Sequence, residues 1–180
     1  MEQWIAKGLH GELDYLERNR DKRYDPRELV PGATAIVIAL MNYHTTGRDY
    51  HRPVKSALYK LAAALNVSTF RVFCDSAPFL ERAWAVESGL GFIGLNRQLI
   101  HPTLGSFIHP GELVLTDPVK FDLPLRNIEA SCGDCRLCVI ACPGHALGGQ
   151  EWDATKCVAY TTHWCLACQT ICPFNKNIHI

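Results

Sequence analysis

Residues 132–143 read CGDCRLCVIACP, and residues 165–173 read CLACQTICP. In the first run the gaps between cysteines are two, two and three residues, and a proline follows the last cysteine. In the second run the gaps are two and three residues, again with a proline at the end. This is the spacing of bacterial ferredoxins that hold two 4Fe–4S clusters, in which the cysteine before the proline ligates the other cluster. The sequence therefore predicts a two-cluster ferredoxin-like domain.

The same spacing divides the thiolates between the two clusters. The second run lacks a cysteine three residues before Cys165, where Thr162 stands, and Cys157 is left to take that place. The first cluster is predicted to be held by Cys132, Cys135, Cys138 and Cys172, and the second by Cys142, Cys157, Cys165 and Cys168. Zinc is the alternative for CxxC pairs, but CxxCxxC followed by xxxCP is not a zinc-ribbon spacing. Cys74 is left without a predicted iron.

The composition is that of a globular protein. The 180 residues are 48% hydrophobic, and 18 basic residues balance 18 acidic ones, so bulk charge does not indicate a non-specific nucleic-acid binder. The longest apolar run, residues 35–41, has the length of a strand, so no membrane association is expected. Residues 1–19 contain no signal-peptide core. We expect a monomer in the cytoplasm, where thiols stay reduced and bind metals.

The residues before the cysteine runs predict an α/β domain. Apolar periodicity and turn residues predict a helix at 2–19, a helix start at Asp25–Pro26, a strand buried on both faces at 33–41, a helix around 54–65, a strand at 69–74, a helix at 78–88, and short strands at 97–101 and 112–116. Strand, helix and strand in this order are typical of a right-handed βαβ unit. We predict an α/β domain at 1–124 and the ferredoxin-like domain at 125–180.

Several upstream stretches resemble one protein family, in the order in which they occur. They are GLHGELDYL (8–16), DPRELVPGA (25–33), GRDYH (47–51), DSAPFLERAWAVESGLGFIGLN (75–96), GSF (105–107) and GEL (111–113). Together with the cysteine runs they resemble the epoxyqueuosine reductases, cobalamin-dependent iron–sulfur enzymes that complete queuosine in the tRNA wobble position. The resemblance covers nearly all of residues 4–175, and DSAPFLERAW is its most specific part. More distantly, reductive dehalogenases share the architecture.

The resemblance implies a nitroreductase-like α/β cobalamin-binding domain joined to the two-cluster domain, with Cys157 as the outlying ligand. It implies that electrons pass through the clusters to cobalt and that an epoxide is reduced to an alkene and water. It also implies that Asp75 donates a proton. Asp75 follows the predicted strand 69–74, so it is placed to face the ligand crevice of an α/β sheet. The alternative is that Asp75 or Ser76 caps the helix that starts near Pro78.

Further cobalamin contacts are expected at four positions. Tyr43 follows the first strand, Asn96 ends the triplet that matches the family's GKN, and Leu166 and Ala167 lie in a cluster loop. Asp75 is expected to contact cobalamin as well. The implied partners are tRNA carrying epoxyqueuosine and an external electron donor such as flavodoxin or ferredoxin. Family members carry an initial strand and helix and a C-terminal helical-repeat domain that grips tRNA. We expect this chain to lack both, and to act on tRNA weakly.

Three functions stay open at this point. The leading one is an epoxyqueuosine reductase. The second is a stand-alone 4Fe–4S electron carrier without cobalamin. The third is a related corrinoid reductase that acts on a small molecule.

Overall fold

The chain forms two compact units in the computed structural model, which describes residues 1–42, 49–119, 128–162 and 165–175. The cysteine unit combines Met1–Arg18, Phe92–Ser106 and Glu129–His179. The sheet unit combines Asn19–Gly91 and Phe107–Ile128. Each unit is thus assembled from segments that are distant in the sequence, whereas the predicted domains, 1–124 and 125–180, are continuous.

A three-stranded antiparallel sheet forms the centre of the sheet unit. Its order is β1 (Ala35–Asn42), β5 (Ile108–Leu115) and β2 (Phe70–Phe73). Both outer strands pair antiparallel with β5, so β1 and β2 run in the same direction without being neighbours. Helix α4 (His51–Ala64) connects them, which confirms the predicted strand–helix–strand order. A short strand was predicted at 112–116, but its position as the central strand between β1 and β2 was not.

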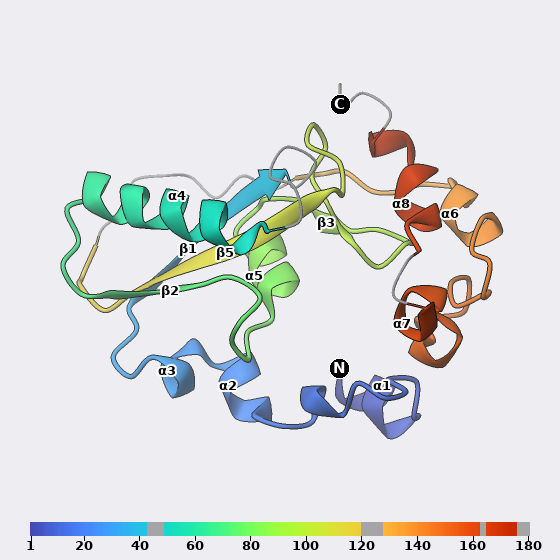
Figure 1. Ribbon diagram of the computed structural model, residues 1–180, viewed down its shortest axis with the longest axis horizontal. Coiled ribbons are helices and arrows are strands. Elements are labelled where there is room, and N and C mark those ends of the chain that lie inside the picture. Colours follow the sequence, from blue (N-terminus) through green and yellow to red (C-terminus); the bar gives the residue numbers. More distant parts are fainter. Residues whose placement is uncertain (43–48, 120–127, 163–164, 176–180) are drawn as a thin grey trace. The chain divides into compact units, whose positions relative to one another are not determined.

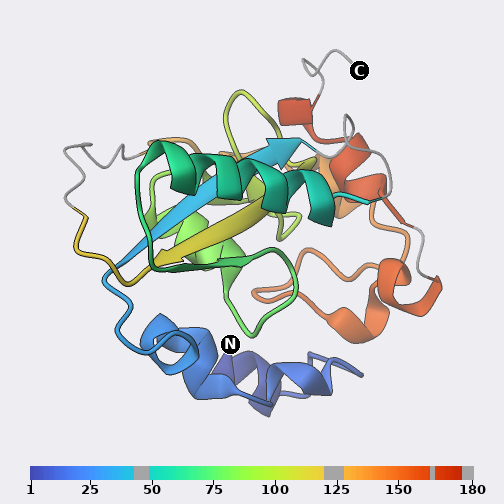
Figure 2. The same cartoon turned by 60° about the vertical axis from the view of Figure 1, so that its left-hand side comes forward.

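Side-chain alternation along β5 gives the sheet two differently packed faces. On one face Leu113 packs with Val54 of α4, which lies along the sheet (Figure 1). On the other face Val114 packs in a cluster with Trp84 of α5 (Glu81–Glu87). Figure 2 shows β1 beside β5 under the length of α4. The core of this unit therefore lies on both sides of β5.

The prediction that strand 33–41 is buried on both faces is wrong. Every residue of β1 is half-buried, because β1 is an edge strand that is paired on one side. The strand buried along most of its length is β5, whose sequence is IHPGELVL. His109, Pro110 and Glu112 interrupt its apolar pattern, so the sequence did not indicate a central strand there.

The helix predicted at 2–19 is much shorter in the structure. Helix α1 covers Glu2–Ala6, and a 3₁₀ turn, η1 (Asp14–Leu16), and α2 (Arg20–Tyr24) follow. Gly8 and Gly11 have φ values of 67° and 58°, in the left-handed region that ends a right-handed helix. The amphipathic spacing of the segment was therefore overridden by two glycines.

The helix start predicted at Asp25–Pro26 is confirmed. Helix α3 covers Pro26–Leu29, and Asp25 accepts a hydrogen bond of 2.9 Å from the backbone N–H of Arg27. The helix predicted at 78–88 begins later, at Glu81, and Gly89 follows its end with a φ of 69°.

The cysteine unit is made of short elements. They are β3 (Phe92–Ile93), β4 (Leu99–Ile100), α6 (Leu137–Ile140), η2 (Ala154–Lys156), α7 (Val158–Thr162), α8 (Ala167–Thr170) and η3 (Pro173–Asn175). The N-terminal segment joins this unit because Trp4 stacks on Trp152, with ring centroids 5.5 Å apart. Ala154 also donates a backbone hydrogen bond of 2.8 Å to Leu9. Within the described ranges, every helix is too short or too polar to span a bilayer.

Candidate cluster cysteines and a carboxyl site

The two cysteine runs adopt the same local conformation. Cys138 lies on α6 and Cys168 on α8, and each of these helices has four residues. At the end of each run the backbone N–H of the cysteine before proline, Cys142 or Cys172, donates to the carbonyl three residues earlier. The repeated CxxCxxxCP spacing thus produces a repeated loop, helix and turn.

The pKa shifts of two thiols indicate which other cysteines lie near them. Burial raises the pKa of the Cys138 thiol, and three neighbouring thiols raise it further: Cys132, Cys172 and Cys135. Burial also raises the pKa of Cys168 to about 11, and four thiols add to this effect: Cys165, Cys138, Cys157 and Cys142. The neighbours of each of these two thiols thus include the other three members of its predicted set, and Cys138 lies near both sets. None of the nine cysteines is in a disulfide.

This donor set fits two cubane clusters chemically. Neighbouring thiolates repel one another, and cluster iron supplies the positive charge that keeps them ionised. Among the described side chains, no group of three or more His, Cys, Asp or Glu is arranged to hold a metal ion directly. A cubane requires a different arrangement, because each thiolate binds its own iron at a separate corner.

Gly144 allows the segment before Cys157 to approach the first cysteine run. A Cβ atom at position 144 would overlap the carbonyl oxygen of Lys156, so a side chain does not fit there. Lys156 immediately precedes Cys157, and Gly144 is two residues beyond Cys142. The close approach therefore places two predicted ligands of the second cluster on neighbouring segments.

Hydrogen bonds from the β3–β4 hairpin tie the two cysteine runs together. The backbone N–H of Leu95 donates to Sγ of Cys132 at 3.4 Å. The Asn96 side chain is 3% exposed, and its amide donates to the carbonyl of Cys168 at 3.5 Å. Its carbonyl oxygen accepts from the N–H of Gln98 at 3.1 Å. Both ends of the Asn96 amide are thus occupied within the cysteine unit.

The other predicted cobalamin contacts are placed as follows. Leu166 is exposed, and Ala167 is half-buried at the start of α8. Tyr43 lies outside the described residues. For Asn96, Leu166 and Ala167 a contact with cobalamin stays a prediction.

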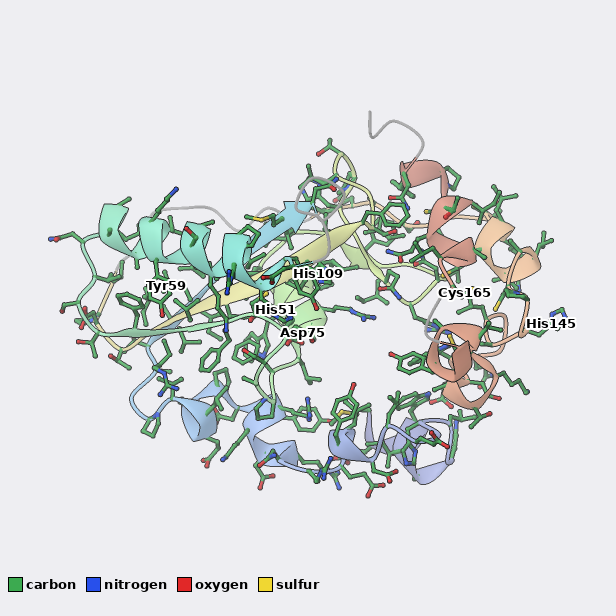
Figure 3. All side chains as sticks on the ribbon, in the orientation of Figure 1. His51, Tyr59, Asp75, His109, His145 and Cys165 are labelled. Atoms are coloured by element: carbon green, nitrogen blue, oxygen red, sulfur yellow. The ribbon has the colours of Figure 1, made fainter. Side chains whose placement is uncertain are left out.

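Asp75 lies on the loop after β2, at the edge of the sheet unit (Figure 3). Its φ is 48°, a left-handed conformation that is uncommon for a residue with a side chain and that often occurs at functional sites. The carboxyl group is exposed, and Tyr50 Oη donates to its Oδ2 at 2.6 Å. The loop thus presents a carboxyl group to solvent and fixes one of its oxygens.

Aromatic and histidine side chains hold Tyr50 in place. Its ring stacks on His109 of β5, with centroids 3.5 Å apart, and on His51, with centroids 4.3 Å apart. His51 Nδ1 lies 3.1 Å from the carbonyl oxygen of Cys74. Since a carbonyl oxygen only accepts, Nδ1 carries the proton. Burial lowers the pKa of His109 to about 4, so this ring is neutral near pH 7.

Two further carboxyl groups belong to this site, and the sequence reasoning assigned neither of them a role. Glu112 on β5 is fully buried, and neither of its carboxyl oxygens has a hydrogen-bond partner among the described residues. Burial, with the charges of Glu81 and Asp75, raises the pKa of Glu112 to about 9. Burial and the charge of Asp75 raise the pKa of Glu81, the first residue of α5, to about 7. The available signal was the acidic residue inside the otherwise apolar stretch GELVL.

The buried thiol of Cys74 lies next to this site. Burial raises its pKa to about 12, and the charge of Glu112 adds to the shift. Cys74 packs with Val54 and Leu113, as expected for a small hydrophobic residue.

The fold and these sites define a mixed α/β protein with a cysteine-rich unit and a cluster of carboxyl groups. No family model matches the chain. The epoxyqueuosine reductase of Leadbetterella byssophila is 34% identical over an alignment of 214 positions, gaps included. The alignment covers 98% of this chain and 70% of that relative. The chain belongs to the epoxyqueuosine reductase family, a family of oxidoreductases, which confirms the resemblance seen in the sequence.

Solved structures of the same family share the fold. The Streptococcus thermophilus epoxyqueuosine reductase matches with a TM-score of 0.84 at 24% identity, over 98% of this chain and 58% of that one. An epoxyqueuosine reductase with a tRNA-Tyr epoxyqueuosine-modified tRNA stem loop matches with a TM-score of 0.77 at 26% identity. This match covers 98% of this chain and 58% of that one. The Bacillus subtilis enzyme, with its aspartate catalytic loop swung out of the active site, matches with a TM-score of 0.75 at 26% identity. This match covers 98% of this chain and 59% of that one. The chain thus spans 58–59% of these solved chains.

Proposed function

We propose that this chain reduces epoxyqueuosine to queuosine in tRNA, with electrons carried by two 4Fe–4S clusters and with cobalamin as a second cofactor. The observation that carries the proposal is that a member of this family has seven cysteines in two runs of the same local conformation and an eighth, Cys157, on a segment that approaches the first run. A relative solved with an epoxyqueuosine-modified stem loop supports the substrate. An external low-potential protein, such as flavodoxin or ferredoxin, supplies the electrons.

The reaction requires electrons and protons in equal number. An epoxide becomes an alkene and water when both of its C–O bonds break, which consumes two electrons and two protons. When bound, the clusters transfer single electrons and cobalamin supplies the strong reductant that acts on the epoxide. The cluster ligands are the two thiol sets described above. The remaining task of the protein is to bring protons to the departing oxygen.

Asp75 is the proposed general acid. Its loop has the strained backbone expected of a catalytic position, and a relative carries an aspartate on a catalytic loop. Because Tyr50 donates to Oδ2, the proton to be transferred is carried by Oδ1.

The test compares Asp75→Asn with the unaltered chain, both purified without oxygen in the presence of cobalamin. The substrate is an anticodon stem-loop bearing epoxyqueuosine, with a strong reductant. Asp75→Asn should keep the absorbance of the clusters and of cobalamin but lower turnover about 10²–10⁴-fold, the usual effect of losing a positioned acid. Asp21→Asn, which changes an exposed carboxylate of the same unit, is the control. Full turnover in Asp75→Asn would mean that another group delivers the proton.

Two outcomes of the same experiment would point to the other functions. A chain that holds its clusters and binds no cobalamin would be an electron carrier. A chain that reduces the free epoxyqueuosine nucleoside and not the stem-loop would be a corrinoid reductase of a small molecule.

A further inference from the structure

The turn between β3 and β4, residues 94–98, brings a backbone N–H to a predicted cluster ligand. The N–H of Leu95 donates to Sγ of Cys132 at 3.4 Å. Cys132 belongs to the predicted set of the first cluster, and Leu95 lies 37 residues before it in the sequence. The contact is therefore made by the tertiary structure and not by the cysteine run itself.

Other thiols of the first set accept hydrogen bonds from donors close to them in the sequence. The N–H of Val139 bonds to the thiol of Cys138, and the N–H of Phe174 bonds to that of Cys172. Such bonds belong to the local loop, since each donor lies one or two residues after its cysteine. The bond from Leu95 is added to them by a segment outside both runs.

We propose that this turn sets the reduction potential of the first 4Fe–4S cluster, with Leu95 as the donor to the Cys132 thiolate and Asn96 as the residue that holds the donor in place. The inference rests on the proposed function only in requiring the clusters. Asn96 acts through Leu95 and is a positioning residue.

The direction of the effect follows from the charge of the cluster. A 4Fe–4S cluster bound by four thiolates gains a negative charge when it is reduced, and its potential depends on hydrogen bonds to the sulfurs. A donated N–H stabilises negative charge on sulfur, so it favours the reduced state over the oxidised one. The bond from Leu95 therefore raises the potential of the first cluster, and an external electron donor reduces that cluster more completely.

Asn96 fixes the turn through both ends of its buried amide. Its Oδ1 accepts from the N–H of Gln98 at 3.1 Å, which closes the turn. Its Nδ2 donates to the carbonyl of Cys168 at 3.5 Å, which ties the turn to the second cysteine run. Leu95 directly precedes Asn96, so these two bonds limit the movement of the Leu95 N–H.

The backbone of the turn is fixed as well. The N–H of Arg97 donates to the carbonyl of Gly94 at 2.9 Å, and the N–H of Gly94 donates to the carbonyl of Gln98 at 3.0 Å. A Cβ atom at position 94 would overlap the side chain of Ile100 and would lie 2.9 Å from Oδ1 of Asn96. Gly94 thus leaves the room that the Asn96 side chain occupies.

A redox titration of the clusters tests the inference without cobalamin, tRNA or turnover. The chain is purified without oxygen, and the electron paramagnetic resonance of the reduced clusters is followed as the potential is lowered. Cys157→Ser, which should keep only the first cluster, assigns the two transitions. In Asn96→Ala the transition of the first cluster should move to a more negative potential and that of the second should move less, with the iron content unchanged.

Three further variants separate the loss of the donor from a general disturbance of the turn. Asn96→Ser can still accept from the N–H of Gln98, so it should restore part of the shift. Gln98→Ala keeps that N–H and should leave the potential unchanged. Leu95→Ala keeps the N–H that donates to Cys132 but removes a side chain that packs against Cys138. Because water then comes closer to the charged cluster, its potential should rise.

The outcomes distinguish this inference from the proposed function. An unmoved potential of the first cluster in Asn96→Ala with full iron, or a fall in Leu95→Ala, would overturn the inference and leave the proposed function standing. If Asn96→Ala did not keep its iron, the smaller fall expected of Asn96→Ser would be measured in its place, and its absence would overturn the inference. An unaltered chain without iron and sulfide would contradict the proposed function itself.

Discussion

At the scale of single residues, Glu112 makes stability depend on pH. Its pKa is about 9 in the folded chain, against an ordinary value of 4.5. The folded state therefore keeps this proton longer than the unfolded state does. The stability that depends on the proton is fully present below pH 4.5 and is lost as pH rises through about 9.

We expect Glu112→Gln to flatten this dependence. Between about pH 6 and about pH 9 its free energy of unfolding should fall by roughly 4 kcal/mol less than that of the unaltered chain, because unfolding of the unaltered chain releases the proton that folded Glu112 keeps. Urea unfolding of the sheet unit, monitored through hydrogen exchange of the β5 amides, measures the difference. Glu81 contributes a smaller part of the same sign, which both chains retain. Equal slopes in the two chains would show that Glu112 releases its proton at the same pH in the folded and unfolded states.

Tyr50 should affect turnover through the orientation of Asp75. Tyr50→Phe removes the 2.6 Å hydrogen bond and keeps the ring that stacks on His109. A hydrogen bond to a neutral group contributes about 0.5–1.5 kcal/mol, so we expect turnover to fall roughly twofold to tenfold with iron and cobalamin contents unchanged. Tyr59→Phe, at an exposed position of α4, the helix that Tyr50 precedes, is the matched control and should turn over normally. Equal rates in the two variants would contradict a positioning role for Tyr50.

At the scale of elements, we expect the approach of Gly144 to η2 to determine whether the second cluster forms. Gly144→Ala places a methyl group against the carbonyl of Lys156, which is backbone and cannot rotate away. The segment carrying Cys157 should therefore shift, and iron should fall from about eight to about four atoms per chain, as expected also for Cys157→Ser. Gly149→Ala, where the nearest atom is 3.3 Å from the added carbon, is the control. A full iron content in Gly144→Ala would show that Cys157 is not a ligand or that the segment adapts.

At the scale of the whole molecule, the two units should respond differently to loss of iron. The α-helices of the cysteine unit have four or five residues, too few to be stable alone, and its core includes Cys138 and Cys142 themselves. The sheet unit instead has a helix of 14 residues packed on a three-stranded sheet. The clusters should therefore contribute much of the folding free energy of the cysteine unit and little of that of the sheet unit.

Removal of iron by a chelator should show this difference directly. Amide hydrogen exchange should become fast at 132–142 and 165–172, because the cluster bonds hold these loops. The strands at 35–42 and 108–115 should keep their protection, since their ladder and core contain no predicted ligand. Fast exchange in both regions would mean that the chain folds as one cooperative body. Unchanged exchange in both would mean that the thiols do not hold iron.

Much of this molecule could be predicted because it depends on short-range geometry. The cysteine runs, the cap at Asp25 and the strand before Asp75 each involve residues a few positions apart, and their conformations follow from spacing and local hydrogen bonds. The two glycines that end α1 also act locally, but the sequence reasoning gave more weight to the apolar stripe.

The tertiary structure decided the features that depend on contacts between distant segments. Strand β5 lies between β1 and β2, although its sequence does not read as a central strand. That pairing buries Glu112 beside α5 and so changes the acidity of a residue whose ordinary pKa the sequence alone would have suggested. The stacking of Trp4 on Trp152 likewise joins the two ends of the chain in one unit. Spacing along the chain is enough to predict which residues bind iron, while desolvation and strand order, which are long-range, decide which carboxyl groups hold a proton.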